Sequence, residues 1–199
     1  MPRIRLPSID DMTPEQREIH DEIVTGVRGK LVGPLRAVLH SPDLARRWSR
    51  LGEFLRFSTC LPKKLNELAI IVTGRRWNSQ LEFLIHAEAG LAAGLTATSI
   101  EAIRLAQPPK FTDDAEAEIY EFARTLQQTG DVDPGLHAAI TKRWGERGVV
   151  EITGVIGYYT MVSMMLNAQQ IPLPDGIAPP LAMPGGGGLT ILPACECLA

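Results

Sequence analysis

Apolar residues recur along most of this chain at the three- and four-residue spacing of amphipathic helices. Residues 44–55 follow that spacing at i, i+4, i+7 and i+11, with Leu44, Trp48, Leu51 and Leu55. Residues 63–77, which follow Pro62, carry a similar apolar stripe. No stretch shows the period-2 alternation, bounded by turn residues, that is typical of hairpin strands. The pattern therefore predicts an all-α fold.

Prolines and capping residues divide this pattern into separate helices. Thr13-Pro14-Glu15-Gln16 supplies an N-cap, a proline at the first helical position and a glutamine three residues after the cap. Signals of this kind predict about seven to eight helices, beginning near Pro14, Pro42, Lys63, Ser79, Thr98, Asp113, Pro134 and Glu146. We expect residues 1–170 to form one helical domain.

The composition changes after Asn167. Residues 171–199 hold six of the 15 prolines, a run of four glycines at 185–188 and only two charged residues, Asp175 and Glu196. Such a stretch neither continues a helix nor builds a core. The sequence predicts a C-terminal arm and a flexible tail over residues 171–199.

Length, charge and cysteine content restrict the class of protein. The chain has 199 residues, with 20 Lys+Arg against 23 Asp+Glu, and no long basic run, so we expect no nucleic-acid partner. No apolar stretch continues without interruption for ~18 residues, and we expect no membrane partner. Three cysteines, at positions 60, 195 and 197, do not make a disulfide framework. These features indicate a cytoplasmic protein.

One pair of polar residues lies within the apolar middle of the chain. Glu82 and His86 are four residues apart, and Ser79 precedes Glu82 by three, so a helix places all three near one face. A carboxylate and an imidazole enclosed together perturb each other's protonation and can transfer protons near neutral pH. The alternative is an ordinary ion pair on a partly exposed helix face. Spacing alone leaves both interpretations open.

Three blocks of sequence resemble the carboxymuconolactone decarboxylase family, which also contains the AhpD-type alkylhydroperoxidases. They are residues 33–42, 61–76 and 79–95, and residues 157–174 resemble the closing helix and arm of the family. The likeness extends over about residues 13–181. It implies an AhpD-like helical bundle that assembles into a homo-oligomer, commonly a trimer or hexamer.

The resemblance also assigns the polar residues. The peroxidase branch carries Cys-x-x-Cys-x-x-x-His, with a glutamate twelve residues before the first cysteine. In this chain the glutamate matches Glu67 and the histidine matches His86, whereas Ser79 and Glu82 stand at the cysteine positions. A serine hydroxyl is not a thiolate at neutral pH, so the thiol chemistry of a peroxidase is disfavoured. Decarboxylase-like members have glutamate at the second position.

The family's decarboxylases remove CO2 from a small lactone carboxylic acid, in the breakdown of aromatic compounds, without a metal or an organic cofactor. This implies a small-molecule substrate, with His86 as proton donor, Glu82 as its partner or general base, and Glu67 as an orienting relay. Candidate substrate-binding residues are Ser79, Arg75, Arg36 and Tyr158. Arg75 also suits a helix C-terminus for electrostatic reasons, and Tyr158 also suits the core.

Two other functions stay open beside the acid–base enzyme. One is an AhpD-type peroxidase or thiol oxidoreductase, and the other is a non-catalytic oligomeric binding protein. Cys195 and Cys197 form a Cys-x-Cys pair that could bind a soft metal or become oxidised. The absence of a cysteine at position 79 favours an incidental role for this pair.

Overall fold

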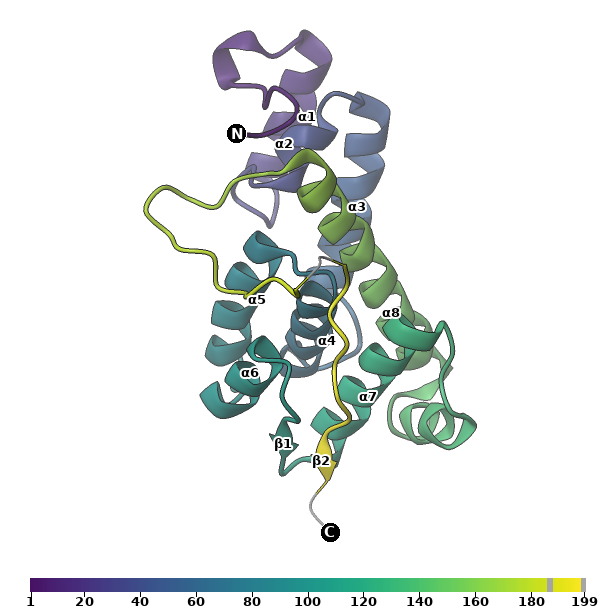
Figure 1. Cartoon of the computed structure of the whole chain (residues 1–199). Helices are drawn as coiled ribbons and strands as arrows, with labels where there is room; N and C mark the ends of the chain where they lie inside the picture. The colour runs from purple at the N-terminus through teal and green to yellow at the C-terminus, as the bar shows by residue number, and fades with distance from the viewer. Residues whose placement is uncertain (186–187, 198–199) are drawn as a thin grey trace.

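The computed structural model of the chain describes residues 1–185 and 188–197, apart from the side chain of Cys197 (Figure 1). The prediction of an all-α fold is confirmed, because the described residues form eight α-helices, one short 3-10 helix and two strands of two residues each. The elements are η1 Ile9–Asp11, α1 Pro14–Thr25, α2 Pro34–Val38, α3 Pro42–Phe57, α4 Lys63–Arg76, α5 Gln80–Ala92, α6 Ala97–Arg104, β1 Lys110–Phe111, α7 Asp114–Thr129, α8 Pro134–Gln169 and β2 Glu196–Cys197.

The helices begin where the capping signals place them, with one difference. The short helix α2 follows Gly33 and Pro34 and is not among the predicted helices. The two helices predicted from Pro134 and Glu146 are both present as the two parts of α8, which a kink at Gly145 separates. Gly145 has φ 70° and ψ 177°, a conformation that glycine adopts without steric cost, and helical geometry resumes after it.

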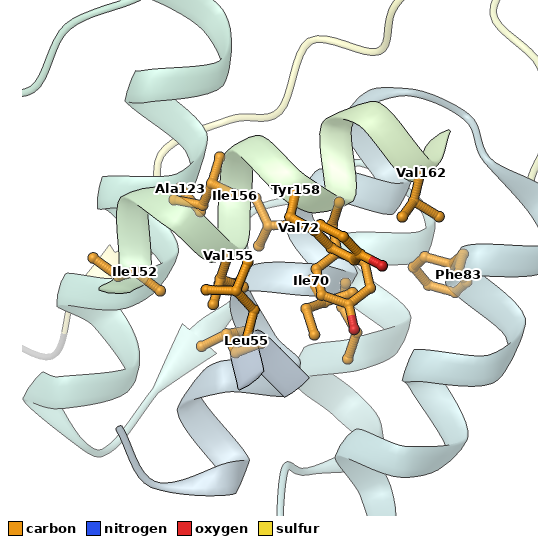
Figure 2. Close-up of a cluster of buried hydrophobic side chains, with 14 of the residues drawn as sticks. Leu55, Ile70, Val72, Phe83, Ala123, Ile152, Val155, Ile156, Tyr158 and Val162 are labelled. Carbon is orange, nitrogen blue, oxygen red and sulfur yellow. The ribbon is translucent and has the colours of Figure 1, made fainter. Parts of the chain in front are cut away.

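Helix α4 lies at the centre of the molecule and packs against α5, α7 and α8 (Figure 1). A run from Leu68 to Val72 is completely buried, which is typical of a helix enclosed on all sides. Figure 2 shows part of the core around it, with side chains from α3, α4, α5, α7 and α8 in one cluster.

Helix α8 is long and apolar enough, by length and composition, to cross a membrane. Half of its most apolar 18-residue window is buried inside the molecule, and the helix packs on α3, α4 and α7. Its buried residues include Ile152, Val155 and Val162, which all face the core (Figure 2). One face of α8 therefore belongs to the core of the protein.

The described part of the predicted flexible tail lies against the body of the protein. Leu192 is 1% exposed, and its backbone N–H donates to Gln128 Oε1 at 2.6 Å. The Cys195 N–H donates to Glu121 Oε1 at 2.7 Å, and β2 pairs in parallel with β1. Single apolar side chains and side-chain acceptors on α7 hold these described residues, and neither gives a periodic signal in the sequence. The side chain of Cys197 is not described, so the expectation for Cys195 and Cys197 as a Cys-x-Cys pair lies outside the described residues.

Candidate functional site

Helices α4 and α5 bring Glu67, Glu82 and His86 together in the interior. His86 Nδ1 lies 2.5 Å from Glu67 Oε2, and His86 Nε2 lies 2.9 Å from Glu82 Oε1. All three are buried: Glu67 is 1% exposed, Glu82 is 4% exposed and His86 is 2% exposed. The enclosed arrangement replaces the alternative of a partly exposed ion pair, because both sides of the imidazole face a buried carboxylate.

The close approach of α4 and α5 depends on a tight corner and on glycine. Asn78 takes a left-handed conformation with φ 51°, and the Ser79 N–H then donates to Gly74 O at 2.9 Å. A Cβ added at Gly90 would lie 2.8 Å from Ile71 Cδ1 and 3.7 Å from Glu67 Cβ. A side chain at Gly90 would therefore crowd the ends of the Ile71 and Leu95 side chains where α5 packs on α4.

The two carboxylates contact the imidazole differently. Glu67 Oε2 accepts a hydrogen bond from His86 Nδ1, and this bond fixes the orientation of the ring. Glu82 Oε1 is close to Nε2 but is not aligned as a hydrogen-bond acceptor, and this buried oxygen has no hydrogen-bond partner. Glu67 therefore orients the ring, whereas Glu82 retains an acceptor position for another molecule.

The charges of the pair decide the protonation of His86. Burial alone would lower the pKa of His86, because it penalises the imidazolium form. The charges of Glu82 and Glu67, together with the hydrogen bond to Glu67, outweigh burial, so the net pKa of His86 is raised above its ordinary value of 6.5. The raised pKa favours the imidazolium form, in which His86 can donate a proton.

A cavity of about 40 Å³ opens beside Glu82 and His86. Its apolar wall includes Leu35, Val162 and Trp48, and its polar lining residues are Arg28, Arg56, Glu82, His86, Tyr158 and Tyr159. The Tyr159 ring meets the imidazole edge-on, with a centroid distance of 5.0 Å. A space of this size takes a carboxylate group or one to two water molecules.

Tyr158 alone among the four predicted substrate-binding residues lines this cavity. Its hydroxyl donates to Trp48 O at 3.3 Å, and burial raises the pKa of Tyr158 to about 12. The neighbouring Arg28 guanidinium acts in the opposite direction on that pKa. Tyr158 is therefore a neutral hydrogen-bond donor at physiological pH.

The other three predicted binding residues lie elsewhere. Ser79 caps α5 and is fully buried, and its Oγ has no hydrogen-bond partner. Arg75 Nε donates to Arg104 O at 2.8 Å, and Arg75 Nη1 donates to Thr190 Oγ1 at 2.7 Å, so this side chain joins α4 to α6 and to the C-terminal segment.

Arg36 has a similar structural position. Its Nη2 donates to Leu6 O at 3.2 Å and to Pro7 O at 3.3 Å, which attaches the N-terminal segment to α2. The guanidinium groups of the cavity belong instead to Arg28 and Arg56, which the sequence analysis does not select. Arg28 lies in a loop without periodicity, and Arg56 is one of four arginines on α3, so neither position carries a distinguishing signal.

A larger hollow in the described part of the surface lies away from this site. It has a volume of about 700 Å³ and lies between the start of α5, the end of α8 and the C-terminal segment. Its lining is mainly apolar and includes Leu81, Met164 and Leu189 but no acid–base group. The acid–base groups line the smaller cavity, and this cavity is therefore the candidate functional site.

No family model and no curated protein sequence matches this chain. Solved structures do match. An uncharacterised peroxidase-related protein from Ralstonia eutropha JMP134, described as an alkylhydroperoxidase AhpD core, superposes with a TM-score of 0.71 and 14% identity, covering 87% of this chain and 93% of its own. A peroxidase-related protein from Silicibacter sp. TM1040 gives 0.69 and 14%, covering 86% of this chain and 91% of its own.

A third match is to a cysteine-to-alanine variant of the debrominase Bmp8 in complex with 2,3,4-tribromopyrrole. It has a TM-score of 0.66 and 13% identity and covers 88% of this chain and 95% of its own. These similarities give the chain an AhpD-like fold, in agreement with the fold that the sequence resemblance implies. At such identities they carry the fold alone.

Proposed function

We propose that this protein is a cofactor-free acid–base enzyme resembling carboxymuconolactone decarboxylase. Its substrate is a small carboxylated lactone or ring compound, and its reaction is a decarboxylation or a related proton transfer. The observation that carries the proposal is the buried His86, bound by Glu67 on one side and in contact with Glu82 on the cavity side.

The three residues divide the proton transfer between them. In a decarboxylation, the bond between carbon and the leaving carboxylate breaks, CO2 departs, and the electron pair passes into the conjugated carbonyl as an enolate. Protonated His86 then delivers its Nε2 proton to carbon, and solvent restores that proton. Glu82 positions the donor or removes a proton from the substrate, and Glu67 keeps the ring in place.

Tyr158 adds a neutral donor for the developing enolate oxygen. Tyr158 lines the same cavity, and its hydroxyl donates to Trp48 O at 3.3 Å and interacts with the Arg28 guanidinium. Donors that are fixed before the reaction stabilise a developing negative charge more than mobile water does. The assignment makes Tyr158 a binding residue, as the sequence analysis proposes.

The AhpD-type peroxidase is the second candidate, because two of the structural neighbours are described as peroxidase-related. Ser79 and Glu82 stand where that chemistry needs two thiols. The two cysteines with described side chains, Cys60 and Cys195, do not line the cavity. Burial, followed by Glu151, raises the pKa of the Cys60 thiol and so opposes thiolate formation.

The third candidate, a non-catalytic oligomeric binding protein, is favoured only by the small volume of the cavity. The partner expectations also remain part of the proposal. A homo-oligomer, a cytoplasmic location, and a small-molecule substrate without nucleic-acid or membrane partners all agree with an enzyme of this class.

The test is an activity assay on the full chain. Carboxymuconolactone and other small carboxylated lactones are supplied, while CO2 release and incorporation of solvent deuterium at carbon are followed. We expect turnover that His86→Ala abolishes. The proposal is wrong if none of these compounds reacts, or if the wild-type protein instead consumes peroxide continuously with a thiol reductant.

A further inference from the structure

Two guanidinium groups of the cavity have buried nitrogen atoms without partners. Nε and Nη2 of Arg28 and Nε of Arg56 are shielded from solvent and lack a hydrogen bond of good geometry, although the Arg28 guanidinium also interacts with the Tyr158 hydroxyl. Both side chains line the same cavity as Glu82 and His86. Buried polar groups are normally paired, and an unpaired N–H of a charged group costs several kcal/mol of lost hydration. The arrangement therefore leaves donors available to a ligand.

The fold keeps space for one of these side chains. A Cβ at Gly52 of α3 would overlap both the Tyr158 hydroxyl and Arg28 Nη2. Gly52 has an ordinary helical conformation and is buried, so a turn does not explain it. The glycine instead allows Arg28, from the loop between α1 and α2, to reach across α3 into the cavity.

The charges of the site favour a single additional anion. Arg28, Arg56 and protonated His86 supply positive charge, and Glu67 and Glu82 supply negative charge, which leaves one positive charge in excess. Charges enclosed at low dielectric are costly when they are not neutralised. One carboxylate would neutralise the site and would also accept hydrogen bonds from the free guanidinium nitrogens.

We propose that Arg28 and Arg56 form a binding subsite for one carboxylate of the ligand, beside Glu82 and His86. The volume of about 40 Å³ is enough for a carboxylate group. This inference rests on the proposed function and deepens it by naming the residues that hold a carboxylate of the substrate. The anchored carboxylate is one that stays on the substrate, because cations that hold a leaving carboxylate would oppose the transfer of its charge into the ring.

The remainder of the ligand has a place next to this subsite. A second cleft of about 200 Å³ is lined by Phe57, Thr59, Lys63 and Asn66, and Arg56 forms part of both spaces. Arg56 thus stands between the outer cleft and the inner cavity. The cleft is large enough for a small ring, and the exposed Lys63 adds a positive charge at its margin.

The experiment uses formate as the probe, because it is little more than a carboxylate. Arginine Nε–Hε signals of the ¹⁵N-labelled full chain are followed by NMR at constant ionic strength. We expect the signals of Arg28 and Arg56 to shift and saturate with formate but not with neutral formamide. Equal shifts with formamide, or equal shifts with chloride, overturn the proposal.

Variants then test the two arginines separately. Arg28→Gln and Arg56→Gln should each weaken formate binding about tenfold or more, since each removes charge-assisted hydrogen bonds. Arg50→Gln is the matched control, because Arg50 lies on α3 with an exposed side chain paired to Glu22 at 3.5 Å. Formate affinity that is unchanged in both cavity variants, or reduced equally in Arg50→Gln, contradicts the subsite.

The design separates this inference from the proposed function. Glu82→Gln should retain or strengthen formate binding, because a neighbouring negative charge is removed, while its turnover falls. If wild-type turnover depends on neither Glu82 nor His86, the acid–base function fails although formate still binds. If formate does not bind while turnover still requires His86, the subsite alone is wrong.

Discussion

Two groups of arginines in this molecule have buried guanidinium nitrogens but differ in their bonding. Arg75 donates to Arg104 O, to Thr190 Oγ1 and to Asn78 Oδ1. Arg28 and Arg56 face the cavity and keep nitrogen atoms without any hydrogen bond. Arg75 is satisfied within the chain and holds the C-terminal segment, whereas the proposed subsite would pair the unused donors of Arg28 and Arg56 with a ligand carboxylate.

The difference teaches that burial and charge alone do not identify a binding arginine. Arg75 is 5% exposed and is more enclosed than either cavity arginine, yet its donors are already used. Arg28 and Arg56 differ from Arg75 because they have donors without a hydrogen bond and lie next to an acid–base group. The predictions below test this division, beginning with catalysis at the cavity.

The largest effect is expected from the acid–base pair itself. His86→Ala and Glu82→Gln should each lower kcat by ~100-fold or more, because general acid–base groups contribute about this much. Arg75→Met, on the other side of the comparison, should leave kcat of the folded protein near that of the wild type. Steady-state kinetics on the same substrate measures all three, and unchanged turnover in the first two breaks the comparison.

Substitution of Arg75 should lower the free energy of unfolding more than substitution of Arg28, although Arg75 does not take part in catalysis. Arg75→Met leaves Asn78, Thr190 and a backbone carbonyl without their donor, so we expect a loss of about 2–3 kcal/mol. Arg28→Met removes a group with unpaired nitrogens, so the change should stay below ~1 kcal/mol or be stabilising. Urea unfolding of the two variants compares them directly. A similar loss in both would mean that Arg28 has structural partners in solution.

A single methyl group should disturb the cavity without changing any charge. The methyl group of Gly52→Ala would occupy the place of the Tyr158 hydroxyl and Arg28 Nη2, so both side chains must move. We therefore expect kcat/KM to fall about tenfold, which is comparable to the loss of one charged hydrogen bond. Gly157→Ala on α8 is the control, because a Cβ there meets nothing within 4 Å. The control should gain up to about 1 kcal/mol of stability from helix propensity and keep full activity. Equal activity in both variants would contradict the role assigned to Gly52.

Much of the fold could be predicted from local signals. Pro14, Pro42 and Pro134 begin helices because proline suits the first turn, and the structure places helix starts at all three. The helix α2 escaped prediction because it is five residues long and its apolar residues do not complete a second turn. The packed C-terminal segment escaped prediction because isolated residues such as Leu192 carry no period.

The candidate site divides in the same way. Glu82 and His86 are on one helix, so their proximity follows from spacing, and the family resemblance adds Glu67. Arg28 reaches the cavity from a loop and Arg56 reaches it from α3. Their proximity depends on tertiary packing, which the spacing of residues in the sequence does not predict. The sequence around Arg36 and Arg75 predicts binding roles for both, whereas the two side chains attach chain segments in the structure.

The smallest expected effect concerns pH and tests which carboxylate controls His86. The raised pKa of His86 means that the acid form persists above pH 6.5, and kcat should fall as pH rises through the elevated value. Stability follows the same sign: the favourable interaction of protonated His86 is fully present below 6.5 and is lost as pH rises through the pKa of the folded state. Glu67→Gln removes one of the two supporting charges, so the alkaline fall in kcat should move to lower pH while Arg75→Met leaves it in place. A pH–rate profile of the three proteins measures this, and an unmoved profile in Glu67→Gln would assign the control of His86 to Glu82 alone.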